Sequence, residues 1–244
     1  MNNYRIALAG NPNTGKSTLF NTLTGMRQHT GNWTGKTVAK AEGEYEFNHK
    51  TYTIIDLPGT YSLYSNSTDE EVARDYIIFD KPDVTVVVID ATSMERNLNL
   101  ALQVMEMTEK VVVCINLIDE AKKKGITIDE NKLARKLGVP VVKISARNKL
   151  GISKLQAAIE AVAAGEIITT PYQVRYNAEI ESMVSALQPE VEQLLGSQYP
   201  SRWIALRLLD GDTGFLKALQ ARGYNKREEV RIPCKETTSV HSTL

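Results

Sequence analysis

One eight-residue stretch near the start, GNPNTGKS at positions 10–17, limits what this chain can fold into more than any other feature. It matches the pattern G-x-x-x-x-G-K-[ST], and it lies between an apolar run at 4–9 and a segment with helical character at 16–24. Two glycines let the chain turn tightly enough for successive backbone N–H groups to face phosphate oxygens, and the helix that follows adds its positive dipole end. The sequence therefore predicts a strand, a phosphate-binding loop and a helix in succession.

The residues of this loop have distinct predicted tasks. Lys16 is expected to reach the β- and γ-phosphates of a nucleoside triphosphate, and the Ser17 hydroxyl to ligate Mg²⁺. The other phosphate-binding residues predicted in this segment are Gly10, Asn11, Asn13, Thr14, Gly15 and Thr18.

Apolar runs alternate with helical segments through roughly the first two thirds of the chain, which indicates an α/β domain. Strands are predicted at 6–9, 41–47, 52–55, 84–89, 111–115 and 141–144. Helices are predicted at 16–24, 69–80, 94–107, 129–137 and 153–163, with Asp129 and Ser153 as caps and Gly25 and Gly138 as stops. Most of the strands are continuously apolar, so we expect a mostly parallel sheet with helices on both faces. The strands at 41–47 and 52–55 predict a hairpin that adds one antiparallel edge strand.

The pattern changes near residues 164–171. Only helical periodicity follows, to about residue 227, with breaks at Pro200 and at 211–214. We predict a P-loop GTPase domain at 1–165, a small all-helical regulatory domain of three to five helices at 166–230, and a disordered tail at 231–244.

The overall composition excludes several classes of protein. The 244 residues carry a formal net charge of +0 and no basic run, which argues against nucleic acid as a partner. The two cysteines, Cys114 and Cys234, match no metal spacing or disulfide framework and suit a reducing cytoplasm. The start lacks the features of a signal peptide, and the apolar runs are too short to span a membrane, so we expect soluble protein.

Two segments that follow predicted strands favour guanine as the base. Asp119, after the strand at 111–115, can accept hydrogen bonds from the N1–H and the exocyclic amine of guanine, which adenine does not offer. Asn116 can tie this loop to the phosphate loop. After the last strand, the backbone N–H of Ala146 is expected to meet guanine O6, with Ser145 bracing the loop. The predicted ligands are therefore GTP and GDP.

The segment IIDLPGTY predicts a nucleotide-dependent switch. Asp56 ends a strand and is placed to hold Mg²⁺ through water, and the Gly59 N–H is placed to contact the γ-phosphate. Loss of that phosphate would release this loop and the threonine-bearing loop after the first helix. Besides the Ser17 hydroxyl, a second hydroxyl group is expected to ligate Mg²⁺, and we choose Thr37 for this role. On sequence alone the competing candidates are Thr22, Thr24, Thr30 and Thr34.

The finer motifs resemble a known family. GNPNTGKSTLFNTLTG, GNWTGKTV, DLPGTYSL, EVARDYI, DATSMERNLNL and NLIDEAKKKGITID resemble, in this order, the cytoplasmic GTPase domain of the FeoB ferrous-iron transport proteins. The segment YPSRWIALRLLDGD resembles the helical domain that follows it in that family. The resemblance implies a membrane permease as the partner, a place on the cytoplasmic side of the inner membrane, and assembly as a homo-oligomer. We expect the chain to be a piece of such a transporter, or else a free-standing paralogue.

The resemblance also implies roles for individual residues. It supports Thr37 as the Mg²⁺-binding threonine, and it places Asn13 beside an activating K⁺ that the backbone carbonyls of Gly31 and Trp33 would complete. Thr60 stands where Ras-like enzymes carry a water-orienting glutamine, so K⁺ could supply the charge that an arginine otherwise provides. The residues implied in hydrolysis are Asn13, Lys16, Thr37, Gly59 and Thr60, and Gly35 joins Thr37, Asp56 and Gly59 in the predicted phosphate-binding set.

Four positions depart from the usual patterns. Leu117 stands where most GTPases carry a lysine, which should weaken nucleotide affinity and speed release. Thr34, Lys36 and Ala39 differ from the residues common in the family and affect the packing of the first switch loop and the strength of the cation site.

Two other functions fit parts of the sequence. A GTP-controlled docking switch of the ribosome-assembly or tRNA-modification type would share the phosphate loop, but it predicts a basic appendage that this chain lacks. An ATP-dependent enzyme would share the loop but not the guanine motifs.

Overall fold

A computed structural model describes residues 3–25, 28–64 and 67–222 of the chain. Its central feature is a seven-stranded sheet in the order β2-β3-β4-β1-β5-β6-β7. The strands are β1 (Asn3–Gly10), β2 (Gln28–Asn32), β3 (Ala39–Phe47), β4 (Lys50–Asp56), β5 (Val84–Asp90), β6 (Val111–Asn116) and β7 (Val141–Lys143). β4, β1, β5, β6 and β7 pair in parallel, whereas β3 pairs antiparallel with both β4 and β2. The mostly parallel sheet with antiparallel pairing at one edge is confirmed, but the outermost strand is β2 and not the predicted strand at 41–47, which is β3.

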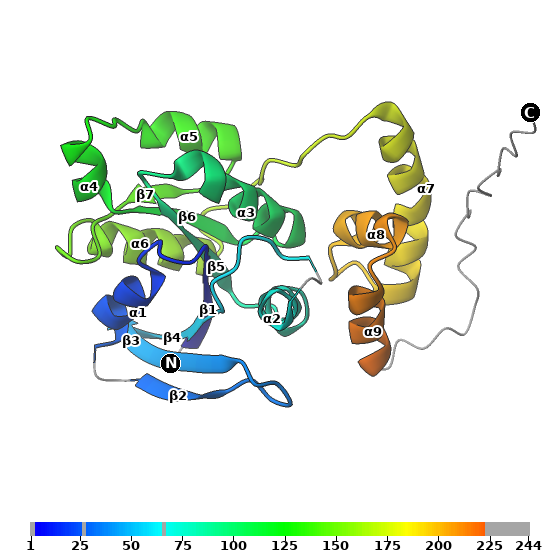
Figure 1. Cartoon of the computed structure of the whole chain (residues 1–244), viewed down its shortest axis with the longest axis horizontal. Helices are drawn as coiled ribbons and strands as arrows, with labels where there is room; N and C mark the ends of the chain where they lie inside the picture. Colours follow the sequence, from blue (N-terminus) through cyan, green and yellow to red (C-terminus); the bar gives the residue numbers. More distant parts are fainter. Residues whose placement is uncertain (1–2, 26–27, 65–66, 223–244) are drawn as a thin grey trace, which may run out of the picture.

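Helices cover both faces of this sheet (Figure 1). They are α1 (Lys16–Thr24), α2 (Thr68–Asp75) with the π-helical turn η1 (Tyr76–Asp80), α3 (Met94–Met107), α4 (Ile118–Lys123), α5 (Glu130–Leu137) and α6 (Ile152–Ala163). Successive β1 side chains alternate between two cores, because neighbouring residues of a strand point to opposite faces. Ile6 and Leu8 pack with α1 and α6, whereas Ala7 and Ala9 share a core with α3 and the C-terminal helices.

The C-terminal helices form a separate group beside the sheet domain (Figure 1). They are α7 (Ala178–Leu195), α8 (Ser201–Asp210) and α9 (Thr213–Ala221). Pro200 precedes α8 and Gly211 ends it, as predicted. Val184, Trp203 and Phe215 belong to the same buried cluster as Leu100 and Val104 of α3, so the helical group and the sheet domain share one apolar core.

Most predicted elements are present, and the differences have physical causes. β2 was not predicted, because its sequence, QHTGN, contains no apolar residue and its backbone pairing with β3 alone defines it. The Asp129 carboxylate caps α5, as expected. The prediction of Ser153 as a cap was wrong: α6 begins at Ile152, after Gly151 at φ 76°.

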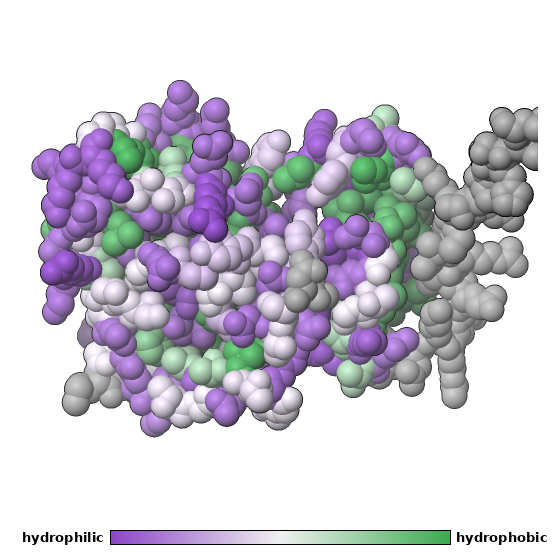
Figure 2. Space-filling view, viewed as in Figure 1, coloured by the Kyte–Doolittle hydropathy of each residue, from purple (hydrophilic) through white to green (hydrophobic). Residues whose placement is uncertain are grey.

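The predicted tail at 231–244 and the last part of the predicted helical domain, 223–230, lie outside the described residues. In the part of the chain that the structure describes, no helix combines the length and apolar character needed to cross a membrane. Figure 2 shows a largely hydrophilic face on which apolar residues gather mainly over the helical group.

Candidate nucleotide-binding site

The loop between β1 and α1 has the backbone geometry that its glycines predict. Gly15 has φ 78°, in the left-handed region that favours glycine. A Cβ atom at Gly10 would lie 2.6 Å from the carbonyl oxygen of Val88 on the neighbouring strand. Asn13 also has a positive φ, 66°, which asparagine tolerates better than most residues. The loop is therefore folded tightly against the carboxyl end of the sheet.

Lys16 is the first residue of α1, directly after this loop, and its side chain is largely buried. Its ammonium group contacts the Asp56 carboxylate at the end of β4 and donates a hydrogen bond of 2.6 Å to the carbonyl oxygen of Leu57. Burial raises the pKa of Asp56, and the positive charge of Lys16 opposes that rise. The residue predicted to hold phosphate and the residue predicted to hold Mg²⁺ are thus brought together.

Asn116, at the end of β6, joins the phosphate loop to the base-binding loops. Its side-chain Nδ2 donates to the carbonyl oxygen of Thr14 at 3.0 Å, and its Oδ1 accepts from the backbone N–H of Ala146 at 3.0 Å. A Cβ atom at Gly15 would lie 2.4 Å from Asn116 Nδ2, so the two segments are in close contact. The predicted tie between the two loops is present.

The same contact changes one expectation. We expected the Ala146 N–H to meet guanine O6, but in this structure it donates to Asn116. A contact with O6 then requires a hydrogen bond shared between two acceptors.

Asp119 lies in the first turn of α4, two residues after Leu117, whose φ is 62°. The Ser145 hydroxyl is the main cause that holds the pKa of Asp119 below its usual value, so the side chain is a carboxylate at neutral pH. Asp119 Oδ1 is buried and has no hydrogen-bond partner among the described residues. Asn148, which the sequence motifs did not single out, donates to Oδ2 at 3.2 Å.

The DLPG segment lies directly over the phosphate loop. The Thr60 N–H donates to the carbonyl oxygen of Gly10 at 3.4 Å, and a Cβ atom at Gly59 would lie 3.4–3.6 Å from atoms of Pro12. The structure therefore brings Gly59 and Thr60 to the same place as Gly10 and Lys16.

The segment predicted to form the first switch, residues 31–37, lies in the β2–β3 hairpin and away from the phosphate loop (Figure 1). Gly31 is in β2, paired with Lys40 of β3, and the residues 33–38 form the turn of this hairpin. The Trp33 ring packs edge-on against Tyr76, with ring centroids 5.3 Å apart, and Lys36 forms an ion pair of 2.8 Å with Glu71. In Figure 1 the tip of the hairpin lies toward α2 and away from the loop between β1 and α1. Thr37 and Gly35, on this tip, are not brought together with Ser17 and Asp56.

The residues present fit Mg²⁺ in part. Ser17 and Asp56 offer the hard oxygen ligands that Mg²⁺ prefers, next to the loop that would hold the phosphates. Thr37 would join them only after the hairpin tip has moved. Of the three predicted K⁺ ligands, Asn13 is exposed in the phosphate loop, where its side chain is accessible. The Trp33 carbonyl oxygen lies in the hairpin turn, where it accepts a hydrogen bond from the Lys36 N–H, so it is not brought together with Asn13.

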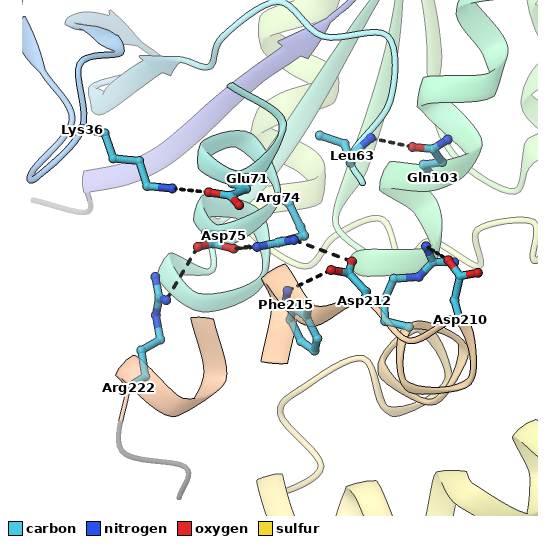
Figure 3. A network of polar contacts seen from close by, with 11 residues as sticks. Lys36, Leu63, Glu71, Arg74, Asp75, Gln103, Asp210, Asp212, Phe215 and Arg222 are labelled. Atoms are coloured by element: carbon cyan, nitrogen blue, oxygen red, sulfur yellow. Dashed lines mark hydrogen bonds and ion pairs between the residues drawn. The ribbon is translucent and has the colours of Figure 1, made fainter. Parts of the chain in front are cut away.

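Ion pairs connect α2 with the helical group (Figure 3). Arg74 is 1% exposed; its guanidinium donates to Asp75 at 2.7 Å and lies 3.8 Å from Asp212, the capping residue of α9. Arg222, at the end of α9, lies 3.7 Å from the other oxygen of Asp75. The helix that follows the DLPG segment is thus held to the helical group by charge as well as by apolar packing.

A parallel sheet, a glycine loop that encloses a buried lysine, and an asparagine that links this loop to the base-binding loops together define a P-loop domain of the GTPase fold. Two sequence families match the chain. The family described as "Ferrous iron transport protein B" matches residues 4–159, and the one described as "FeoB cytosolic helical domain" matches residues 176–242. The chain belongs to the FeoB family of ferrous iron transport proteins.

Individual relatives agree with this assignment. The chain is 47% identical over 212 residues to the Fe(2+) transporter FeoB of Methanocaldococcus jannaschii, a match that covers 87% of this chain and 31% of the relative. The solved cytosolic domain of the T. maritima FeoB iron transporter in a GDP form has a TM-score of 0.82 and 37% identity, covering 94% of this chain and 89% of that one. Its GMPPNP form has a TM-score of 0.81 and 36% identity, covering 93% and 88%. The chain spans less than a third of the length of the curated relatives that it matches.

Proposed function

We propose that this chain binds and hydrolyses GTP and is the regulatory part of a ferrous-iron transporter. In the whole protein it would lie on the cytoplasmic side of the inner membrane, beside a permease in the same polypeptide and within a homo-oligomer. The observation that carries this proposal is the Asn116 junction, which holds the phosphate loop and the base-binding loops together in one cradle. The GDP and GMPPNP forms of the T. maritima relative support guanine nucleotides as the ligands.

Each residue of the cradle has a task in this proposal. Backbone N–H groups from Gly10 to Thr18 surround the phosphates, and Lys16 leaves Asp56 to neutralise the β- and γ-oxygens. Asp119 and Ser145 select the base. Gly59 and Thr60 already lie over the phosphate loop, from which the Gly59 N–H can turn toward a γ-phosphate.

Two cations complete the proposed site. Ser17, Asp56 and Thr37 would hold Mg²⁺, which neutralises charge on the β- and γ-phosphates when bound. Asn13, with the carbonyl oxygens of Gly31 and Trp33, would hold K⁺. No arginine or glutamine of this chain is assigned to the transferred phosphoryl group, so the proposal gives the charge-stabilising task to K⁺.

Regulation would pass through α2. In the first predicted switch segment, Lys36 contacts α2 and Trp33 contacts η1. The second, the DLPG segment, precedes α2 in the chain. The Arg74 and Arg222 ion pairs then join α2 to α9. A change in nucleotide would alter these contacts and so reach the helical group. Membership of the FeoB family favours this function over a ribosome-assembly switch.

The test is a hydrolysis assay with GTP and ATP, each in K⁺ and in Na⁺. We expect hydrolysis of GTP but not of ATP, and a faster rate in K⁺ than in Na⁺. Asn13→Ala should remove the difference between the two salts. Asn48→Ala is the matched control, because Asn48 also has a positive φ, 48°, but lies in the β3–β4 turn, where it bonds Glu160.

The outcomes separate the parts of the proposal. Equal rates in K⁺ and Na⁺ would remove the K⁺ site and leave the GTPase. Hydrolysis of ATP at the rate of GTP would overturn the base assignment. No nucleotide binding at all would overturn the whole proposal.

A further inference from the structure

Asn148 lies where the two base-binding loops meet. Its side-chain Nδ2 donates to Asp119 Oδ2 at 3.2 Å and to Ser145 Oγ at 3.0 Å. A primary amide nitrogen carries two hydrogens, so both donors of Asn148 are used on the two side chains predicted to surround guanine. No sequence motif assigns this residue a role.

The loop that carries Asn148 is closed and well ordered by its own backbone. Ser145 and Leu150 exchange two hydrogen bonds of 3.1 Å, and the N–H groups of Asn148 and Lys149 donate to the carbonyl oxygens of Ser145 and Ala146 at 3.2 Å. Gly151, which follows, has φ 76°, and a Cβ atom there would lie 2.4 Å from the carbonyl oxygen of Lys143. The backbone therefore fixes where the Asn148 amide is presented.

Asp119 needs such a support. It lies on α4, a helix of only six residues that begins after a left-handed residue, Leu117. With one oxygen held by Asn148, rotation of the carboxylate about its own bond is restricted, and the other oxygen, Oδ1, is buried and has no partner among the described residues. Each carboxylate oxygen can accept two hydrogen bonds, so Oδ2 can keep Asn148 and still accept one from a base.

We infer that Asn148 is a positioning residue for guanine selection: it holds the Asp119 carboxylate beside Ser145 in one orientation, so that the carboxylate addresses one base edge. This inference rests on the proposed function, since it names the residue that sharpens base choice at the same site. The side-chain hydrogen bonds of Asn148 are to Asp119 and Ser145, neither of which is proposed to hold phosphate or metal, so the inferred role concerns base affinity.

A competing arrangement makes the opposite prediction. The Asn148 amide is chemically similar to the exocyclic amine of guanine, and it could occupy the place of that amine on Asp119. Removing it would then free the carboxylate and tighten binding. The second hydrogen bond, to Ser145, favours support over competition, because it holds the amide on the side of the β7–α6 loop.

The experiment compares GDP with IDP, whose base keeps the N1–H of guanine but lacks its exocyclic amine. Dissociation constants are measured by calorimetry in Mg²⁺ for the wild type, for Asn148→Ala, and for Arg147→Ala, an exposed neighbour in the same loop, as the control. Loss of a hydrogen bond to a charged group that is partly exposed to solvent should weaken GDP binding by about 3- to 10-fold. IDP binding should weaken less, so the preference for GDP over IDP should fall, whereas Arg147→Ala should leave both unchanged.

Several results would overturn the inference. For Asn148→Ala these results are an unchanged dissociation constant for GDP, tighter binding of GDP, or an equal loss of affinity for GDP and IDP. An equal loss would indicate a general loosening of the loop. Failure of the wild type to bind GDP would instead refute the proposed function, so the two failures are distinguishable.

Discussion

Replacing Asn116 by alanine should separate the phosphate loop from the base-binding loops. Asn116 is 1% exposed, and its two hydrogen-bond partners, the Thr14 carbonyl oxygen and the Ala146 N–H, belong to residues that are each 2% exposed. Both groups would lose their partner in a place that bulk water does not reach. A buried polar group without a partner costs about 1–3 kcal/mol, so two of them should lower the free energy of unfolding by about 3 kcal/mol in total. For a chain of this size that corresponds to a fall in Tm of about 6–12 °C.

The measurement is urea unfolding without nucleotide, followed by a thermal scan. Asn116→Asp is the informative second variant, because it keeps an acceptor for Ala146 but places a second acceptor against the Thr14 carbonyl. We expect it to be at least as unstable as Asn116→Ala, despite its similar size. Asn131→Ala, at an exposed position of α5, is the control and should change stability by less than about 0.5 kcal/mol.

The reasoning would be refuted if Asn116→Ala unfolded within about 1 kcal/mol of the wild type and lost only nucleotide affinity. That result would mean that the two loops are held in place by packing alone, and that the asparagine serves only the ligand.

Two other predictions concern contacts outside the nucleotide site. Arg74→Ala should lower the free energy of unfolding by about 3–5 kcal/mol in urea, because it removes the cation that Asp75 and the buried Asp212 share. Arg222→Ala removes a more exposed partner of the same Asp75 and should lower the free energy of unfolding by less than about 1 kcal/mol. Equal losses of stability in the two variants would contradict the argument that burial makes the Arg74 ion pairs the stronger ones. Glu181 is held by Arg202 in two hydrogen bonds of 2.8 Å, which lower the pKa of Glu181 from 4.5 to about 2. A carboxyl group whose pKa is lower in the folded state stabilises that state at pH values above the unfolded-state pKa, and this stabilisation is lost as the pH falls toward the folded-state pKa. Glu181→Gln should therefore be less stable than the wild type at pH 7, and the difference in stability between the two should shrink between pH 4.5 and 2. Urea midpoints at several pH values measure this, and a difference that grows on acidification would contradict the assignment.

The sequence predicted those parts of the site that depend on local chemistry. The phosphate loop, the mostly apolar predicted strands and Asn116 follow from glycine spacing, from hydrophobic runs and from a polar residue at a strand end, all of which act within a few residues. β2 could not be predicted in this way, because QHTGN has no apolar residue and becomes a strand only when β3 offers its edge. α4 is too short to give a periodic signal.

Two features of the base-binding loops depended on contacts between distant segments. The Ala146 N–H was predicted to face the base, and its bond to Asn116 joins residues 30 positions apart. Asn148 gave no signal at all, because its importance comes from Asp119, which is 29 residues away. Side chains that act on another side chain across the fold leave no spacing pattern in the sequence.

The position of the hairpin turn at 33–38 is compatible with the proposed Mg²⁺ site if the gain from binding Mg²⁺ exceeds the contacts that hold this turn beside α2 and η1. The Lys36–Glu71 ion pair is about one third exposed on both sides and is worth at most about 1 kcal/mol. The edge-on contact of Trp33 with Tyr76 adds about 0.5–1.5 kcal/mol beyond the stabilisation from the apolar area that Trp33 buries against the neighbouring core. A ligand can shift such an equilibrium only by its difference in affinity for the two states. The proposed coordination of Mg²⁺ by Thr37 would be possible in only one of them, and a difference of about 3 kcal/mol would favour that state more than 100-fold. In the proposed switch, the Lys36 ion pair would bias the hairpin toward the position beside α2, and binding of Mg²⁺ and nucleotide would have to overcome that bias.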